Sequence, residues 1–173
     1  WFAPTAWDLA SELDAAFGTD TLADALPHVL PQLRALQNAD GSFGAAPGGK
    51  GHPAATAYVL SRLAPVADTL ADTIRAEAAA WLMPQLQGNG QLPGDDHGLI
   101  TAWLLIGLQD RLAELAPSLA FLRNHQGEQG DYSGSALTTI EALRALANDA
   151  RANLSIDAAG LVIEPEQPMS GDA

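Results

Sequence analysis

The chain contains no cysteine, and this absence removes several kinds of chemistry. Disulfides, thiolate zinc sites, cysteine nucleophiles and internal thioesters all need a cysteine sulfur. Basic residues are also scarce: Lys50 is the one lysine, there are seven arginines, and the formal net charge is −13. Nucleic acids and anionic membranes attract clustered positive charge, so neither is expected as a partner. No apolar run approaches the roughly 18 residues that predict a membrane span.

Acidic residues, by contrast, are plentiful and stand singly between apolar ones, as Asp14, Asp20 and Asp24 do. This pattern is typical of a solvated outer surface. The apolar part is dominated by alanine and leucine, which favour helices. A chain of 173 residues, 47% of them hydrophobic, is long enough for one domain with its own core. It begins with Trp1 rather than methionine, as we expect of a piece of a longer chain, so it predicts no cellular compartment.

Four segments repeat a pattern in which threonine stands among small or apolar residues and leucines follow. They are 4–13, 55–63, 100–108 and 138–146. In the last three, leucines follow the threonine by four and seven positions, which is the spacing of one buried face of a helix. We therefore expect these leucines to be buried between helices: Leu60, Leu63, Leu105, Leu108, Leu143 and Leu146.

A second helical run follows each of the first three segments and ends in a turn rich in glycine and polar residues. Asparagine, aspartate and glycine end helices and reverse the chain because they tolerate positive φ. Each turn also offers one bulky residue, which we expect to pack back between neighbouring hairpins: Phe43, Leu92 and Tyr132. The repeating unit is therefore predicted to be helix–turn–helix–loop, with about three and a half units in the chain.

Two places depart from this repeat. Pro27 and Pro31 interrupt the first connecting run and predict a kink or break near His28. Beyond residue 150 the pattern changes, so we expect a helical repeat domain over 1–150 and an extended tail or linker over 151–173. Within that tail, alternating apolar residues predict a short hairpin or extended segment near 154–163.

The turn Gln37-Asn38-Ala39-Asp40-Gly41-Ser42-Phe43 resembles the Gln-x-x-Asp-Gly-Ser-Trp/Phe signature of the prenyltransferase/squalene-oxidase repeat. The Thr-Ala segments are similar to the inner helices of that family, and the resemblance covers roughly residues 4–148. It implies an all-α fold, an α/α-toroid-like arc of about three and a half helical hairpins with an irregular or short β C-terminal tail. The family includes class II terpene cyclases, protein prenyltransferase β subunits, complement-type thioester domains and cobalamin carriers.

The catalytic residue sets of these relatives do not map onto this chain. The cyclases carry an Asp-x-Asp-Asp segment directly before Thr-Ala, where this chain has Ala or apolar residues at 54–55 and 99–100. Asp95 and Asp96 lie six and five residues before the threonine. Prenyltransferase zinc sites need a cysteine, and at 126–129 a glutamine stands where thioester domains have one. We therefore assign no catalytic residue, metal or cofactor, and an enzyme is disfavoured.

Polar residues recur at matching points of the repeats, and a toroid would bring them together. His52 and His97 each lie four residues before their threonine, and Ser135 takes that place in the last segment. Loops held by a rigid scaffold often carry binding groups. The candidate ligand-binding residues are Lys50, His52, Asp95, Asp96, His97, Tyr132 and Ser135. In the alternative interpretation, an aspartate here caps a helix N-terminus and binds no ligand.

Two functions remain open at this point. The first is a non-catalytic binding or scaffold module, part of a larger protein or a self-associating half-toroid. The second is a fragment of a class II terpene-cyclase-like or prenyltransferase-like enzyme whose acid lies outside this chain. The missing catalytic sets favour the first, with a small anionic or apolar ligand. Trp1, Phe2 and Trp7 have no preceding hairpin to cover them, which predicts a homodimer or a neighbouring domain at that end.

Overall fold

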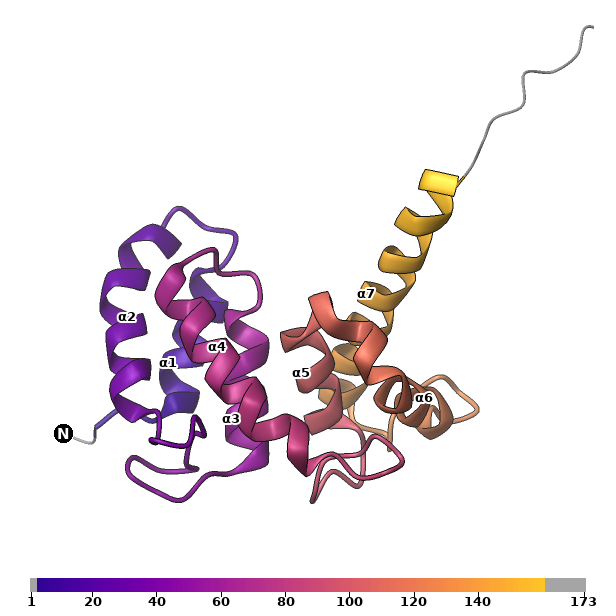
Figure 1. The fold of residues 1–173 in the computed structure, drawn as a ribbon, viewed down its shortest axis with the longest axis horizontal. Helices are drawn as coiled ribbons and strands as arrows, with labels where there is room; N and C mark the ends of the chain where they lie inside the picture. The colour runs from indigo at the N-terminus through magenta and orange to yellow at the C-terminus, as the bar shows by residue number, and fades with distance from the viewer. Residues whose placement is uncertain (1–2, 161–173) are drawn as a thin grey trace, which may run out of the picture.

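The computed structural model describes the backbone of residues 3–160 and the side chains of 3–151. Apart from two isolated bridges in a loop, this part of the chain forms helices and connecting turns, which confirms the all-α prediction (Figure 1). The α-helices are α1 (Ala6–Ala16), α2 (Leu22–Leu36), α3 (Pro53–Leu63), α4 (Thr69–Leu82), α5 (Leu99–Gly107), α6 (Ala116–His125) and α7 (Ala136–Gly160). Two 3-10 segments, η1 (Met83–Gln85) and η2 (Gln109–Leu115), follow α4 and α5.

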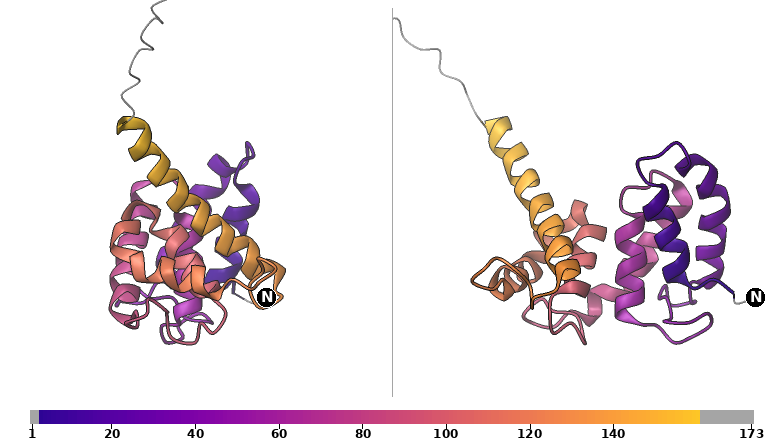
Figure 2. Two further views of the ribbon diagram at one scale, coloured as in Figure 1. Left: turned by 90° about the vertical axis from the view of Figure 1, so that its right-hand side faces the viewer. Right: turned by 180° about the vertical axis from the view of Figure 1, so that it is seen from behind.

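The helices form an inner series and an outer series. Each of α1, α3, α5 and α7 packs against the next one in that order. The helices between them lie outside, with α2 against α1, α4 against α3 and α6 against α5 (Figure 2). This is the layer order that the family resemblance implies, and nothing in it conflicts with an arc of the α/α-toroid type.

The leucines of the second and third repeats form the core, as expected. Leu60, Leu63, Leu105 and Leu108 are buried. The inner helices approach closely at Gly107, where an added Cβ would lie 2.4 Å from Cγ of Leu60. Close packing of this kind stabilises a helical domain through the apolar area it removes from water.

The same prediction is wrong for Leu143 of α7, and Leu146 is only partly buried. Leu143 keeps 48% of its surface exposed, while the small residues Ala142 and Ala145 face the core. The reason is the number of neighbours. Helices α3 and α5 lie between two inner helices and are covered by an outer one, whereas α7 packs against α5 and η2 within the described residues.

Helix α2 is continuous through both prolines, so the expected break near His28 is wrong. A proline deprives the carbonyl four residues earlier of its hydrogen bond. Pro27 and Pro31 are four residues apart and both lie on the exposed face of α2. Water can therefore bond the unpaired carbonyls, while Val29, Leu30 and Leu33 hold the opposite face in the core.

Helix α7 is longer than expected and continues to Gly160, so the described part of the predicted tail, 151–160, is helical rather than extended. Alanines are frequent between Ala136 and Gly160, no proline interrupts them, and alanine has the highest helix propensity. The C-terminal half of α7 projects away from the other helices (Figures 1 and 2). The rest of the expected tail, 161–173, lies outside the described residues.

The glycine-rich turns are built alike. In each, a glycine with φ near +85° donates its N–H to the carbonyl three residues earlier, at 2.8–2.9 Å; these glycines are Gly41 (+88°), Gly90 (+83°) and Gly130 (+82°). Positive φ is a conformation that glycine adopts without steric cost. The bulky residue after each turn, Phe43, Leu92 or Tyr132, is fully buried, which confirms that it packs into the core.

Candidate functional site

A pocket of about 370 Å³ opens beside the N-terminal ends of the inner helices, and we call it the N-terminal pocket. Its walls come from all four inner helices and from the loop that precedes α5. Residues from the inner helices that line it are Trp7, Ala54, Leu99, Ile100, Trp103 and Thr138. Since the loop supplies Asp95, Asp96 and His97, three of the seven predicted residues meet here.

Two of the lining residues, Trp7 and Trp103, form an aromatic cluster with Tyr58. Trp7 stacks on Tyr58 with ring centroids 4.3 Å apart and an interplanar angle of 23°. Trp103 meets both rings edge-on, at 5.4 Å from Trp7 and 5.0 Å from Tyr58. The Tyr58 hydroxyl lies 2.9 Å from the hydroxyl of Ser11. Stacked and edge-to-face aromatic pairs are favourable, so the cluster ties α1, α3 and α5 together.

The position of Trp7 differs from the predicted one. It does not form an uncovered end of the chain, because its ring packs on Tyr58 of α3 and Trp103 of α5. Trp1 and Phe2, the other members of the predicted contact surface, lie outside the described residues. The predicted homodimer or domain contact at this end therefore remains a prediction.

Asp95 acts as the cap of α5, the alternative that the sequence left open. Its two carboxylate oxygens accept hydrogen bonds from the backbone N–H groups of Ile100, at 3.0 Å, and Thr101, at 2.7 Å. The side chain is buried, with 3% of the residue exposed. Such bonds satisfy N–H groups that a helix start leaves unpaired. Asp96, next in the chain, is exposed and keeps its carboxylate at the pocket rim.

His97 connects two loops at the same rim. Its Nδ1 lies 2.8 Å from the hydroxyl of Ser133, in the turn that precedes α7. Ser133 has a positive φ of 54°, and the neighbouring glycine, Gly134, also has positive φ. A serine in this region is held there by its surroundings. Nothing in the sequence predicts this contact, because Ser133 and His97 are 36 residues apart.

The other four predicted residues do not line the N-terminal pocket. Lys50 lies in the loop before α3 and His52 lies at the end of that loop, and both residues are exposed. The Ser135 hydroxyl accepts hydrogen bonds from the N–H and hydroxyl of Thr138, at 3.2 and 3.0 Å, and so supports the start of α7. Tyr132 is fully buried and its hydroxyl has no hydrogen-bond partner within the described residues, so burial raises its pKa. Tyr132 is therefore a core residue.

Helical spacing is the signal that could have found the aromatic cluster. Ala54, Tyr58 and Arg62 follow one another at intervals of four along α3, so they share one face. Trp7 and Trp103 stand two residues after the threonines of their own segments, where Tyr58 stands in the second repeat. The first three repeats thus share a common aromatic position.

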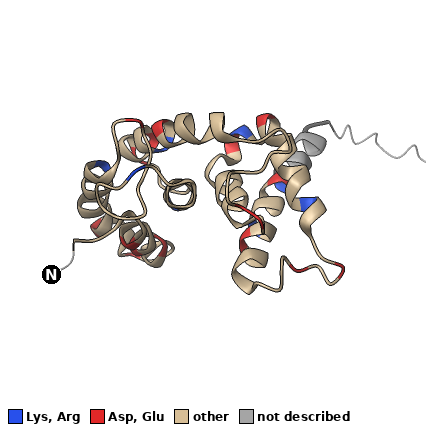
Figure 3. Ribbon diagram, turned by 90° about the horizontal axis from the view of Figure 1, so that it is seen from below, with Lys and Arg blue, Asp and Glu red and all other residues tan. Residues whose placement is uncertain are grey.

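Within the described residues no group of three or more histidine, aspartate or glutamate side chains is arranged to hold a metal ion. None of the described helices combines the length and apolarity needed to cross a bilayer. Aspartate and glutamate residues occur in both halves of the described chain (Figure 3). Comparison with known proteins found no match: no family model, no curated protein and no solved structure corresponds to this chain.

Proposed function

We propose that this chain is a non-catalytic binding module of the α/α-toroid type, which holds a small, largely apolar molecule in the N-terminal pocket. The observation that supports the proposal most is the aromatic cluster of Trp7, Tyr58 and Trp103, contributed by three successive inner helices. Small-molecule sites are concave, mostly apolar and lined by aromatic side chains with a few polar groups.

The charge of the lining favours an apolar ligand over an anionic one. The pocket is lined by neither lysine nor arginine, and the exposed carboxylate of Asp96 lies at its rim. An anion would be repelled by that carboxylate, whereas a neutral molecule with a hydroxyl or amide group could donate a hydrogen bond to it. His97 stands beside Asp96 and offers a second polar contact.

The pocket is less suited to the chemistry of a terpene-cyclase-like enzyme. An alkene-protonating acid has to be held in its protonated form beside other carboxylates. Here Asp95 uses both oxygens to cap α5, and Asp96 is exposed to water. This is why we propose a binding module rather than an enzyme fragment.

The proposal is tested by titrating the protein with N-phenyl-1-naphthylamine, a neutral apolar probe whose fluorescence rises in apolar sites. Trp7→Leu removes one ring of the cluster and should weaken binding about tenfold, the effect of one aromatic contact. Trp81→Leu is the matched control, because Trp81 belongs to the outer helix α4 and does not line the pocket. Circular dichroism confirms that both variants fold.

Two results would refute the proposal. One is the absence of saturable probe binding to the unmodified chain. The other is an equal loss of affinity in Trp7→Leu and Trp81→Leu, which would place the probe on general apolar surface rather than in the N-terminal pocket.

A further inference from the structure

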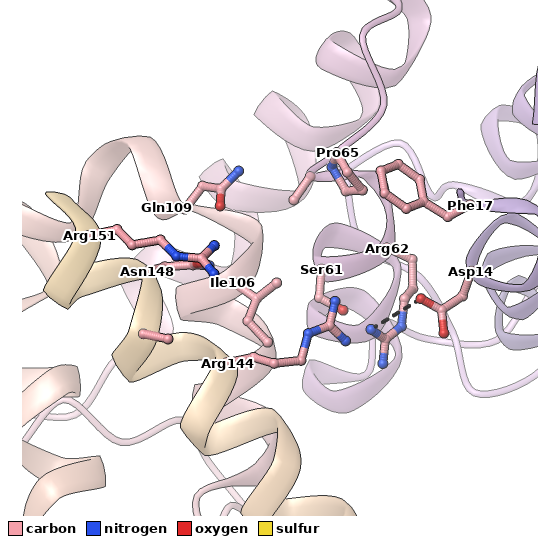
Figure 4. Close-up of a pocket in the computed structure, with 12 residues that line it drawn as sticks. Asp14, Phe17, Ser61, Arg62, Pro65, Ile106, Gln109, Arg144, Asn148 and Arg151 are labelled. Atoms are coloured by element: carbon pink, nitrogen blue, oxygen red, sulfur yellow. Dashed lines mark ion pairs between the residues drawn. The ribbon is translucent and has the colours of Figure 1, made fainter. Parts of the chain in front are cut away.

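A second hollow lies at the opposite end of the inner helices, where it is bounded by α1 and α7 and floored by the C-terminal parts of α3 and α5. Figure 4 shows this hollow, which we call the C-terminal groove. Its volume is about 290 Å³. The groove shares no lining residue with the N-terminal pocket, so a site here is independent of the apolar-ligand function proposed for that pocket.

Arginine side chains are concentrated in this groove. Arg62 comes from α3, and Arg144 and Arg151 come from α7, so three of the seven arginines meet in a chain whose net charge is −13. Figure 4 shows their side chains directed toward the space between α7 and α1. Such a gathering is unexpected in an acidic protein and creates a local region of positive charge.

Two carboxylates lie near these three guanidinium groups. Glu141 is buried and pairs with both Arg62 and Arg144, the latter at 3.2 Å. Asp14 lies 3.5 Å from Nη1 of Arg62. Arg151 forms no ion pair with any described side chain. Three positive charges therefore face two negative ones.

Arg62 fixes a permanent charge in the wall of the groove. Its side chain is 5% exposed and its guanidinium carbon lies 4.8 Å from the ring centre of Tyr58. Its Nε and Nη1 have no hydrogen-bond partner within the described residues. Burial acts to lower the pKa of Arg62, but the hydrogen bond and charge of Glu141 outweigh it and raise the pKa. The group therefore stays charged.

The rest of the lining is apolar or carries neutral donors. Phe17 is a large apolar side chain with 47% of its surface exposed, and Pro65 and Ile106 lie beside the same space. The amide groups of Gln109 and Asn148 stand near Arg151 (Figure 4). An apolar wall beside cationic groups is suited to a molecule with an apolar body and one negative group.

The helix ends oppose the binding of a negative group. Helices α1, α3 and α5 all end near the groove, and helix C-termini carry partial negative charge. Arg62 lies in the last turn of α3 and partly offsets that charge. Arg144 and Arg151 come from α7, which does not end at the groove, and Arg151 pairs with no described carboxylate, so its charge is available to a ligand.

We propose that the C-terminal groove binds a small organic carboxylate. The carboxylate lies between Arg144 and Arg151, where planar guanidinium groups can donate paired hydrogen bonds to it. The apolar body lies against Phe17 and Pro65. This defines a site distinct from the N-terminal pocket, with the opposite preference for charge.

Isothermal titration calorimetry with 4-phenylbutyrate tests the assignment on the unmodified chain. We expect saturable binding that weakens about tenfold in Arg151→Gln and again in Arg144→Gln, because each loses a charge-assisted hydrogen bond. Arg111→Gln is the matched control: it removes the same charge, but Arg111 pairs with Glu114 outside the groove, at 2.6 Å. The control should bind as the unmodified chain does.

Three analogues distinguish the sources of affinity. The amide 4-phenylbutyramide should bind at least about tenfold more weakly than the carboxylate, since it has the same body without the charge. Inorganic phosphate should also bind more weakly, because it cannot contact the apolar wall. The amine 4-phenylbutylamine should not bind.

The proposal is overturned if 4-phenylbutyrate does not bind, if the amine binds better than the carboxylate, or if phosphate binds as tightly. Equal loss in Arg111→Gln and Arg151→Gln would also overturn it, since the net charge alone would then account for binding. Trp7→Leu should leave carboxylate binding unchanged, so failure of this site and failure of the N-terminal pocket are separately visible.

Discussion

Losing the ion pair between Arg62 and Glu141 should lower the free energy of unfolding of the helical domain substantially. The pair joins α3 to α7 across α5, and both side chains are about 95% buried. Removing one partner of a buried pair leaves the other charge without compensation and costs about 3–5 kcal/mol. Asp14 still lies 3.5 Å from Arg62, so for Glu141→Leu we expect a loss at the lower end, about 3 kcal/mol.

The double variant separates the value of the pair from the cost of an orphaned charge. In Arg62→Met with Glu141→Leu, two apolar side chains of similar size replace the pair. Such replacements are often neutral or stabilising. We therefore expect the double variant to lie within about 1 kcal/mol of the unmodified chain, so the coupling energy should approach the sum of the two single losses.

Urea unfolding followed by circular dichroism measures these free energies, and urea is preferred to guanidinium because it does not screen charge. Arg144→Met is the control: Arg144 pairs with the same carboxylate but is half exposed, so its loss should cost less than about 0.5 kcal/mol. A loss below about 1 kcal/mol in Glu141→Leu would refute the reasoning. So would a double variant whose loss equals the sum of the two single losses.

Three further predictions concern the turns, the cap and the core. Gly41→Ala should cost more than Gly48→Ala by at least about 1 kcal/mol in urea unfolding: both have positive φ, but an added Cβ at Gly41 would lie 2.4 Å from a carbonyl oxygen of α4, while none is near Gly48. Asp95→Ala should lower the free energy of unfolding by about 1–2 kcal/mol, while the exposed Asp96→Ala should change it by less than about 0.5 kcal/mol; equal effects would contradict the cap. Tyr132→Phe should keep its stability at neutral pH. Above pH 10.0 its free energy of unfolding should fall less than that of the unmodified chain. The pKa of Tyr132 is raised in the folded state, so the tyrosine ionises first in the unfolded chain and thereby favours unfolding. Identical urea midpoints for both chains at high pH would contradict this.

The features that could be predicted from sequence are those set by local chemistry. A glycine at positive φ, or an apolar residue every third or fourth position, has the same meaning wherever it stands. The turn around Gly41 and the burial of Phe43 were therefore predictable. The repeat threonines share a contact that their spacing did not predict: Thr56 and Thr139 both accept a hydrogen bond from the N–H of the bulky turn residue, at 2.9 and 3.0 Å.

Burial on α7 was not predictable in the same way. Thr139 makes the same contact in the last repeat as Thr56 makes in the second, so the register of the repeat is correct. Leu143 is nevertheless exposed, because a leucine at the right register is buried only where a neighbouring helix covers it. The prolines of α2 depend on packing as well. The free-energy cost of a proline within a helix is smaller when the unpaired carbonyl lies on an exposed face, where water can bond it. In both cases the outcome depends on packing between helices rather than on the local sequence.

The site residues divide along the same line. Asp95, Asp96 and His97 are adjacent in the chain and were found from the loop they share, and they do lie at a pocket. Arg62 and Glu141 are 79 residues apart, and each alone resembles an ordinary charged position on a helix. Their burial follows from the way α3 and α7 both pack against α5, an arrangement that periodicity alone does not specify. A charged residue that shares a helix face with an aromatic one, as Arg62 does with Tyr58, is therefore the signal to search for on the inner helices of such repeats.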